Sequence, residues 1–405
     1  MSLTRLEQAV SAKLADLRAE GRLKGAEKVV TAIREGRDCY GPRVLLAGQG
    51  DKEFLRMNSN SYLGLSLHPE VIKAEEEAVR RFGAGPGAVR FISGTCEPHV
   101  ELEKKLAAFH GREAGMIFSA AYAAIMGVLP QLITDETLVV SDELNHNSII
   151  NAIRLSRPAQ KAIYRHLDMA GLEAVLKEHS GKVRRAVVVT DGIFSMRGDH
   201  APLDRVVEVC RAYETGYEEG IITVVDDSHG VGAFGKTGRG TEEYVGARVD
   251  ILLATLGKAL GVNGGYVVAS APVVEYLRET SPFYIYSNPI TPGEAAAAAR
   301  SLEILDSPEG LAMLEKIRYL ASRLREGFAK LGYETIAGDH PIVPLLVRDT
   351  RRTADLVRFL FDHGILATGL NYPVVPKGEE EIRFQVNASH TDRDVESLLR
   401  ILKKF

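Results

Sequence analysis

Polar residues follow two apolar runs in the middle of the chain, and their types could act together on a bound ring. Asp226 and His229 come after the run 221–225, and Lys258 comes after the run 251–256, inside a glycine-bracketed turn. A lysine amine is nucleophilic only when it is neutral, and a lysine held in a cleft at the end of a buried strand can lose its charge. The chemistry indicated is covalent catalysis by Lys258, and the alternative is a solvated surface lysine.

Asp226 and His229 extend this prediction to a cofactor. A buried carboxylate paired with a pyridine nitrogen keeps that nitrogen protonated, which makes pyridoxal phosphate (PLP) a strong electron sink. Asp227 follows directly, but consecutive side chains of an extended segment face opposite sides, so only one of the two carboxylates need face the ligand. Together with Lys258, these residues predict a PLP site. A helix N-cap with a surface carboxylate is the alternative for Asp226.

The same region carries a glycine pattern typical of dinucleotide-binding proteins. Residues 230–235 read Gly-Val-Gly-Ala-Phe-Gly and follow a predicted strand, and Asp250 stands about 20 residues from their start. In a nicotinamide-binding fold such glycines open a helix directly. Here Asp-Asp-Ser-His separates them from the strand, and residues 236–241 have the composition of a loop. An NAD-dependent oxidoreductase is therefore only a distant alternative.

Three further positions are candidates that are weak on their own. His146 follows another predicted strand and could stack on a cofactor ring or donate a proton, although a lone histidine is more often structural. Arg383 lies in a strand pattern, where a buried guanidinium can hold a carboxylate through two hydrogen bonds or form an ordinary salt bridge. The segment 119–123 could begin a helix whose N-terminal amides bind a phosphate.

Short apolar runs predict the strands that position these residues. Several runs are continuous β-branched stretches, which suits a sheet buried on both faces, and helical patterns separate them. A mostly parallel central sheet flanked by helices follows, with ligands at the carboxyl ends of its strands. The predicted strands are 115–119, 137–141, 186–190, 221–225, 251–256 and 265–269.

Further elements are predicted on either side of this region. Thr4 and Glu7 form a capping-box pattern before apolar residues at helical spacing, which predicts an N-terminal helix that packs against a neighbour such as another subunit. Thr291 and Glu294 form a second such pattern, which opens a helix leading to a smaller α/β C-terminal domain. That domain has predicted strands near 342–347, 365–368 and 382–386. The chain is thus predicted to divide into an N-terminal helical arm of residues 1–54, a large PLP-binding domain of residues 55–290 and a small domain of residues 291–405.

Composition narrows the classes of function. The 405 residues carry a formal net charge of −4 without a basic run, which argues against a nucleic-acid partner. Three cysteines lie far apart and the N-terminus lacks a signal-peptide pattern, which indicates a cytoplasmic protein with reduced thiols. Residues 114–134 are free of charge, but their polar residues and changing periodicity predict a buried strand, loop and helix rather than a membrane span. We predict no membrane partner and no metal site.

With these residues in place, the chain from residue 55 onward resembles the α-oxoamine synthase family of fold-type I PLP enzymes. Any one of the motifs could arise by chance, but their order along the chain is specific. The resemblance implies an α/β fold of the fold-type I PLP-dependent transferase kind. The motifs cover residues 58–65, 90–95, 191–196, 226–232, 238–240 and 255–260.

The resemblance implies a role for each candidate residue. Lys258 would bind PLP as a Schiff base and carry the Cα proton of the substrate, Asp226 would pair with the pyridine nitrogen, and His229 would bond the phenolic oxygen. His146 would stack over the ring and polarise the thioester carbonyl. Ser195 would lie near the ring oxygen. Thr255, the backbone of Ala121 and Tyr122, and Ser287 of the partner subunit would surround the phosphate. Asn60 and Arg383 would bind the amino-acid carboxylate. Because such sites lie at a subunit interface in this family, a homodimer is implied.

Within the family, the chain is most similar to the 2-amino-3-ketobutyrate CoA ligases, also called glycine C-acetyltransferases. The 8-amino-7-oxononanoate synthases and serine palmitoyltransferases share most motifs and remain alternatives. The chain departs from the family pattern in the apolar segment 123–125, the long link 213–220 and the short turn 261–264, which leaves the acyl group and the amino acid open. The similarity to the ligases lies in residues 141–146, 256–260, 372–378, 382–383 and 388–391.

The implied reaction joins an amino acid, expected to be glycine, to an acyl-CoA, expected to be acetyl-CoA, and gives 2-amino-3-oxobutanoate and CoA. Lys258 would remove the Cα proton, the carbanion would attack the thioester carbonyl, and CoA would leave. The bond that breaks must stand perpendicular to the cofactor ring, and the Arg383 clamp would set that angle.

Overall fold

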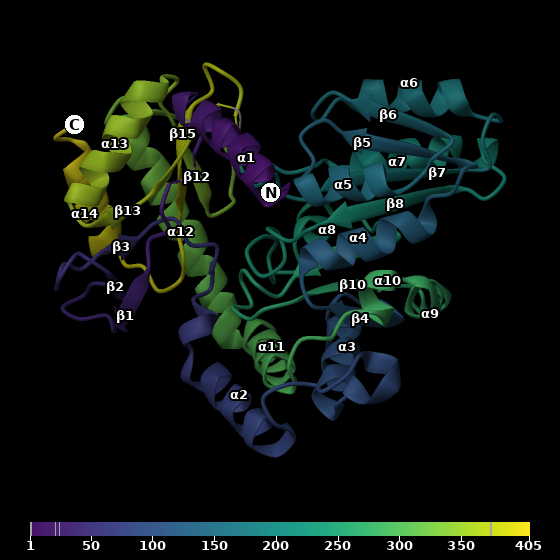
Figure 1. Ribbon diagram of the computed structural model, residues 1–405, viewed down its shortest axis with the longest axis horizontal. Coiled ribbons are helices and arrows are strands. Elements are labelled where there is room, and N and C mark those ends of the chain that lie inside the picture. The colour runs from purple at the N-terminus through teal and green to yellow at the C-terminus, as the bar shows by residue number, and fades with distance from the viewer. Residues whose placement is uncertain (1, 21, 24, 373–374) are drawn as a thin grey trace.

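A seven-stranded sheet forms the core of the part on the right of Figure 1 in the computed structural model, which describes residues 2–20, 22–23, 25–372 and 375–405. The strand order is β4-β10-β9-β8-β7-β5-β6. Strands β5 to β9 run parallel to one another, and β10 runs antiparallel to both β9 and β4. The mostly parallel sheet predicted from the apolar runs is confirmed. Its strands are β4 (Ala114–Phe118), β5 (Thr137–Asp142), β6 (Gln160–Tyr164), β7 (Arg185–Asp191), β8 (Ile221–Asp226), β9 (Ile251–Thr255) and β10 (Gly265–Ala269).

The strand predictions miss β6, which lies at one edge of the sheet. It pairs only with β5, and most of its residues are at least partly exposed. An edge strand buried on fewer sides does not need the continuous apolar run that marks the central strands. The six predicted strands correspond to the other six strands of the sheet.

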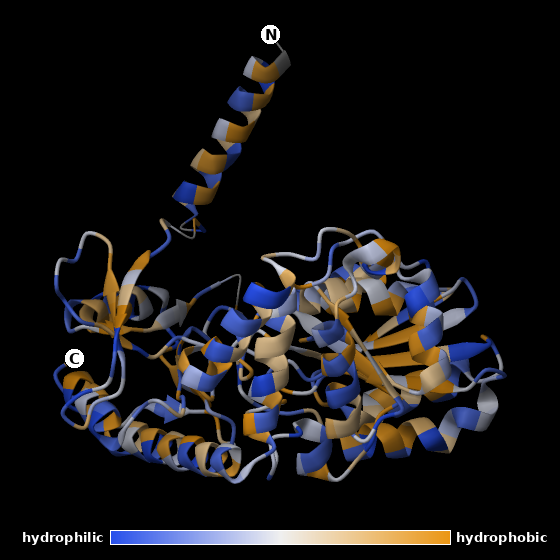
Figure 2. Cartoon of the chain, turned by 90° about the horizontal axis from the view of Figure 1, so that it is seen from below, coloured by the Kyte–Doolittle hydropathy of each residue, from blue (hydrophilic) through white to orange (hydrophobic). Residues whose placement is uncertain are grey.

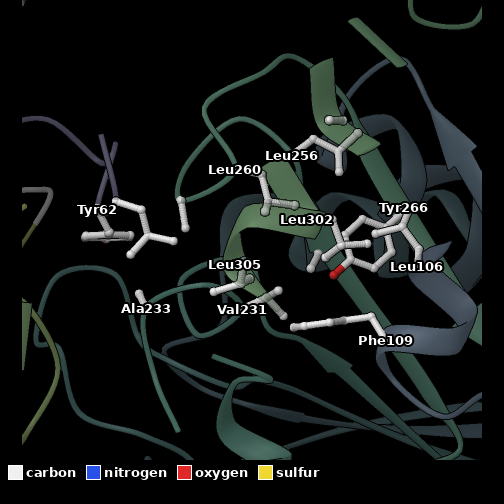
Figure 3. Close-up of a cluster of buried hydrophobic side chains, with 14 of the residues drawn as sticks. Tyr62, Leu106, Phe109, Val231, Ala233, Leu256, Leu260, Tyr266, Leu302 and Leu305 are labelled. Carbon is white, nitrogen blue, oxygen red and sulfur yellow. The ribbon is translucent and has the colours of Figure 1, made fainter. Parts of the chain in front are cut away.

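Helices cover both faces of the central sheet. Successive residues of a strand point to opposite faces, so each strand contributes side chains to the core on either side. Val225 and Leu252 pack on one face in a core shared with α3 and α11, part of which Figure 3 shows, whereas Val224 and Leu253 pack on the other face with α4 and α5. The covering helices are α3 (Glu97–Phe109), α4 (Ala121–Leu132), α5 (Asn147–Leu155), α6 (Met169–His179), α7 (Leu203–Tyr213), α9 (Ala271–Thr280), α10 (Pro282–Ile285) and α11 (Pro292–Leu305). Helix α2 (Pro69–Phe82) packs against α11.

The charge-free stretch 114–134 forms β4 and α4 inside this core. Met116 and Phe118 of β4 and Val128 and Leu129 of α4 are buried. The predicted strand, loop and helix are confirmed. Among the residues that the structure describes, no helix is long and apolar enough to cross a membrane.

A second sheet of four antiparallel strands lies toward the C-terminus, in the order β11-β12-β15-β14. Ile382 and Phe384 of β15 pack against α12, α13 and α14. Alternation therefore turns Glu381, Arg383 and Gln385 to the opposite side of the strand. These elements are β11 (Glu334–Thr335), β12 (Ile342–Leu346), β14 (Thr368–Leu370), β15 (Glu381–Gln385), α12 (Pro308–Lys330), α13 (Thr350–Asp362) and α14 (Asp392–Leu402).

The prediction of one strand over 365–368 is wrong, because this run serves two different sheets. β13 (Ile365–Leu366) pairs in parallel with β3 (Leu55–Arg56), whereas β14 pairs with β15. The break is set by partners that are distant in sequence, which a local apolar pattern does not reveal. Strands β1 (Val30–Arg34) and β2 (Arg43–Leu46) form a separate antiparallel pair.

The two predicted capping boxes have different outcomes. At the start of α11, Thr291 Oγ1 accepts a hydrogen bond from Glu294 N (3.0 Å) and Glu294 Oε2 accepts one from Thr291 N (2.7 Å), as predicted. Helix α1 (Ser2–Ala19) begins before Thr4, so Thr4 lies within its first turn and the predicted start there is wrong. Leu6 is among the exposed apolar residues along α1, which projects from the rest of the molecule in Figure 2. The partner that would cover this helix and the division into three domains remain predictions.

Candidate active site

A cavity at the carboxyl ends of β7, β8 and β9 brings together most of the predicted site residues. Parallel strands end at the same edge of a sheet, so residues far apart in sequence meet there. Of the predicted residues, Asn60, Arg383 and Ser287 are outside the lining. The cavity is lined by Ala121, Tyr122, Ile125, His146, Ser148, Asp191, Ile193, Ser195, Asp226, Ser228, His229, Thr255 and Lys258.

Lys258 lies in a tight turn that follows β9. Thr255 Oγ1 accepts a hydrogen bond from Gly257 N (3.0 Å) and donates one to Gly264 O (3.1 Å), which ties the two ends of the turn together. Thr255 also lines the cavity. The turn therefore fixes the backbone from which Lys258 extends into the cavity.

The surroundings of Lys258 favour its neutral form. Burial lowers the pKa of its ammonium group, and the charge of Arg383 lowers it further. Asp226 and Asp191 act in the opposite direction, but the net shift of the Lys258 pKa is downward. A larger fraction of this lysine is neutral at a given pH than of a surface lysine, which is the condition for a nucleophile or a base.

Asp226 and Asp227 face opposite sides of the strand end. Asp226 lines the cavity, and its Oδ1 accepts a hydrogen bond from Ser228 N (3.1 Å). Asp227 accepts hydrogen bonds from Thr241 N (2.6 Å) and Thr241 Oγ1 (2.7 Å). Burial raises the pKa of Asp227 to about 7, although the bonds from Thr241 oppose that shift. Asp226 is thus the carboxylate available to a ligand, and Asp227 organises the loop behind it.

The first glycine of the dinucleotide-like pattern, Gly230, makes room for Asp227, as does Gly240 beyond the pattern. A Cβ atom at Gly230 would lie 2.0 Å from Asp227 Oδ1, and one at Gly240 would lie 2.0 Å from Oδ2. The next helix, α8 (Thr241–Val245), begins only after this loop. The glycines of the pattern therefore open no phosphate-binding helix.

Asp191 belongs to the cavity but was not a candidate from sequence. Its partner in the register of β7 and β8 is Asp226, and its Oδ2 accepts a hydrogen bond from His146 N (3.0 Å). Burial, and then the charge of Asp226, raises the pKa of Asp191 well above its usual range. Adjacent buried carboxyls resist joint ionisation, which favours the protonated form of Asp191. Asp191 follows the apolar run 186–190 just as Asp226 follows 221–225, and this parallel could have identified it.

His229 is held by a tyrosine that the sequence did not single out as a site residue. The hydroxyl of Tyr62 lies 2.7 Å from His229 Nδ1, and both side chains are buried. Burial lowers the pKa of His229 far below its usual range and raises that of Tyr62, so both groups are neutral. When Tyr62 donates, the imidazole proton resides on Nε2, which can then donate to a ligand. His340 Nε2 fixes the backbone by donating to His229 O (2.8 Å).

His146 stands at the N-terminus of α5 and contributes a neutral ring. Its Nδ1 accepts a hydrogen bond from Ser148 N (3.2 Å) and lies 2.7 Å from Ser148 Oγ. Burial lowers the pKa of His146, Asp226 raises it, and Lys258 lowers it, with a net downward shift. The ring meets Tyr122 edge-on, with 6.3 Å between centroids. It is thus positioned by its own helix start, in the wall of the cavity.

The start of α4 offers hydrogen-bond donors to an anion. Helix α4 begins at Ala121 without a side-chain cap, so its first amides have no intrahelical partner and meet the cavity at Ala121 and Tyr122. Ser228 Oγ is buried in this lining and lacks a hydrogen-bond partner among the described residues. A phosphate is the ligand that such donors accommodate. With Lys258, Asp226 and His229, the donor set fits PLP.

Arg383 is braced by groups on both sides of its guanidinium. Its Nη1 donates to Ser195 O (2.7 Å), and its Nη2 lies 3.4 Å from Asn60 Oδ1. The amide of Gln385, in the orientation that satisfies its neighbours, places its oxygen 2.6 Å from both Nε and Nη2 of Arg383. The structure thus brings Asn60 and Arg383 together, as a carboxylate clamp requires, and adds Gln385 as a support.

Two predictions from sequence lie outside this arrangement. Ser287 is partly buried and is separate from the cavity lining. The motif 372–378 falls partly outside the described residues. The contribution of Ser287 to a partner's site remains a prediction.

Comparisons with known proteins agree with the cavity chemistry. The model of the class I and II aminotransferase family matches residues 52–402. The chain is 39% identical over 402 residues to the 8-amino-7-oxononanoate synthase of Geobacter sulfurreducens, covering 99% of this chain and 98% of that protein. It is also 39% identical over 398 residues to the mitochondrial 2-amino-3-ketobutyrate coenzyme A ligase of Mus musculus, covering 98% and 91%. The solved serine palmitoyltransferase of Sphingomonas wittichii matches with a TM-score of 0.86 at 27% identity, covering 99% and 97%.

The chain therefore belongs to the class I and II aminotransferase family and, within it, to the α-oxoamine synthases, which are PLP-dependent acyltransferases of fold type I. The resemblance drawn from the motifs is confirmed, as is PLP as the cofactor. The two kinds of relative match at the same identity, so the choice of acyl group turns on the residues around the site.

Proposed function

We propose that the protein condenses a small amino acid, foremost glycine, with the acyl group of acetyl-CoA, forming 2-amino-3-oxobutanoate and releasing CoA. The observation that carries the proposal is the junction of Lys258, Asp226 and His229 in one cavity, next to a braced arginine. Bound PLP supplies an electron sink for the negative charge that develops at the amino-acid Cα.

Lys258, Asp226 and His229 divide the proton transfers between them. Lys258 Nζ, whose pKa is lowered by burial, removes the proton from the amino-acid Cα. Asp226 holds a proton at the pyridine nitrogen of the cofactor. His229 donates from Nε2 to the phenolic oxygen, because Tyr62 occupies its Nδ1.

Arg383 and Asn60 orient the amino acid. A guanidinium binds a carboxylate through two parallel hydrogen bonds, which fixes the direction of the Cα–H bond relative to the ring. The bonds from Arg383 to Ser195 O and toward Gln385 stop the guanidinium from rotating. Ser195, which lines the cavity, would lie beside the ring oxygen of the cofactor. The orientation set by Arg383 and Asn60 thus determines which bond at Cα is broken.

The remaining predicted residues hold the cofactor and the thioester. His146 would stack on the cofactor ring and polarise the thioester carbonyl, while Thr255 and the amides of Ala121 and Tyr122 would bind the phosphate. Ser287 of the partner subunit would complete the phosphate site, so the proposed working form is a homodimer. Its proposed location is the cytoplasm. The exposed apolar side of α1 supports a subunit contact.

The test is a panel of substrates on purified holoenzyme. Glycine, alanine and serine are each combined with short, medium and long acyl-CoA thioesters, and free thiol is measured. We expect the highest kcat/KM with glycine and acetyl-CoA. A maximum with a long acyl-CoA, or with alanine or serine, identifies another kind of α-oxoamine synthase. Thiol release in a reaction that contains no amino acid contradicts the proposal, because the amino acid is the proposed acceptor of the acyl group.

A further inference from the structure

A second cavity adjoins the first at Ser195, which lines both. It lies between the loop that follows β7 and the face of the small sheet that is turned away from its helices. Much of its wall is apolar, including Phe194, Met196, Leu346 and Val375. A molecule that reaches Lys258 past Ser195 can therefore place an aliphatic portion here.

The two arginines of this cavity are already paired. Arg348 donates to Glu334 through Nη2 (2.6 Å) and Nε (3.0 Å). Arg197 Nε donates to Asp199 (2.8 Å), and its Nη1 lies 3.8 Å from Glu379. In the described lining, no arginine is left to receive a further carboxylate.

Glu381 is the exception to this pairing. The residue is 3% exposed, lines the cavity, and has an Oε1 atom without a hydrogen-bond partner among the described residues. It lies two positions before Arg383 on β15, so both side chains are on the same face of the strand. A buried, unpaired carboxyl group costs stability, which calls for a reason to keep it.

The charges around Glu381 leave it mostly protonated near neutrality. Burial raises its pKa to about 8, Arg383 and Arg197 lower it, and Glu379 and Asp199 raise it. Asp199 is itself bonded to His166, and Arg383 donates to Ser195 O and lies outside the lining of this cavity. Above pH 8 the cavity gains a negative charge.

We infer that this cavity receives the acyl group of the thioester, and that Glu381 restricts it to acyl groups without a terminal carboxylate. An uncharged chain meets the apolar wall. A terminal carboxylate loses its hydration there and finds no unpaired arginine in the described lining, and once Glu381 ionises it also meets a second negative charge. The inference rests on the proposed function and deepens it, because it distinguishes uncharged acyl groups from those with a terminal carboxylate.

The test compares thioesters of equal length that differ only in terminal charge. Binding of heptanoyl-CoA and pimeloyl-CoA to the PLP-loaded protein is measured by calorimetry without amino acid, at pH 7 and pH 9, and butyryl-CoA is compared with succinyl-CoA at pH 7. We expect the uncharged member of each pair to bind at least about tenfold more tightly at pH 7. That ratio should grow at pH 9, because Glu381 ionises between the two values.

Variants isolate the role of Glu381. In Glu381→Gln the ratio should be the same at pH 7 and pH 9, because the amide does not ionise. His166 titrates in the same range, but it lies outside the lining of this cavity, so its titration should leave the ratio in Glu381→Gln unchanged. Glu326→Gln makes the same chemical change at an exposed position on α12 and should keep the wild-type pH dependence.

Three outcomes overturn the inference: equal or tighter binding of the carboxylated thioesters, a ratio in Glu381→Gln that still grows with pH, or no binding of any of the four thioesters. Thiol release is measured separately. If no amino acid supports thiol release while the binding ratios hold, the proposed reaction is wrong and the assignment of Glu381 stands. If an amino acid supports thiol release but the binding ratios differ from those expected, the proposed reaction stands and the assignment of Glu381 is wrong.

Discussion

The cavity around Lys258 and the cavity beside Glu381 meet at Ser195, but they are built in opposite ways. The first is formed by the ends of neighbouring parallel strands, where Asp191 and Asp226 are paired by strand register. The second is formed by a loop and the inner face of a small antiparallel sheet, and its buried carboxyl is unpaired. The sheet edge thus carries the groups for the chemistry, whereas the surface of the second cavity is the one that we infer selects the substrate.

The largest effect is expected from Lys258→Ala, which removes the base from the first cavity. The loss of positioned proton transfer should lower kcat by about 10²- to 10⁴-fold, with loss of the visible absorbance of the lysine-bound cofactor. Lys236→Ala, an exposed lysine in a nearby loop, is the control and should keep both. Turnover that survives in Lys258→Ala would place the chemistry elsewhere.

Arg383→Ala should separate the amino acid from the acyl group. Loss of charged hydrogen bonds to the carboxylate is expected to raise the KM for the amino acid by about ten- to a hundredfold, with a much smaller change in the KM for acyl-CoA. Steady-state kinetics with each substrate varied in turn measures both. Equal increases in the two constants would count against a carboxylate clamp and would blur the division between the cavities.

Tyr62→Phe should have a smaller effect that is confined to the first cavity. Removal of the hydroxyl frees the His229 tautomer, and the loss of one neutral hydrogen bond is expected to lower kcat by about two- to tenfold, with little change in either KM.

Tyr266→Phe provides the matched control for this variant. Tyr266 is another buried tyrosine, and its hydroxyl lies 2.8 Å from His110 Nε2, outside the cavity lining. It should cost stability but leave kcat unchanged. If both variants lower kcat alike, Tyr62 acts through general stability and not through His229.

The smallest effect concerns His166, which supports the loop of the second cavity. Burial lowers its pKa, but hydrogen bonds to Asp142 and Asp199 outweigh burial and raise the pKa to about 9. A pKa above the ordinary value near 6.5 means that this pairing stabilises the fold below pH 6.5 and is lost as the pH rises through about 9. Urea midpoints of wild type and His166→Gln should converge over that range. Parallel pH curves for the two proteins would contradict the pairing.

The sequence predicts the first cavity far better than the second. Continuous apolar runs mark the central strands, and parallel strands end at one edge, so Lys258, Asp226, His229 and His146 could be expected to meet. Tyr62 could not be assigned, because its contact with His229 joins positions 167 residues apart.

Glu381 shows the opposite case. It belongs to the run Glu379-Glu380-Glu381, which has the composition of a solvated charged surface. Strand alternation and the packing of the small sheet against the loop after β7 bury it, and neither is visible in a local pattern. Edge strand β6 and the divided run 365–368 escaped prediction for the same reason, since their environment comes from distant segments.

The most direct test of the account is the location of the cofactor on the chain. The purified PLP-loaded protein is reduced with borohydride and digested, and the lysine that carries the pyridoxyl group is located by mass spectrometry. The account predicts modification at Lys258, in the turn after β9. Modification at another lysine, or a protein that carries no pyridoxyl group after incubation with PLP, would contradict it.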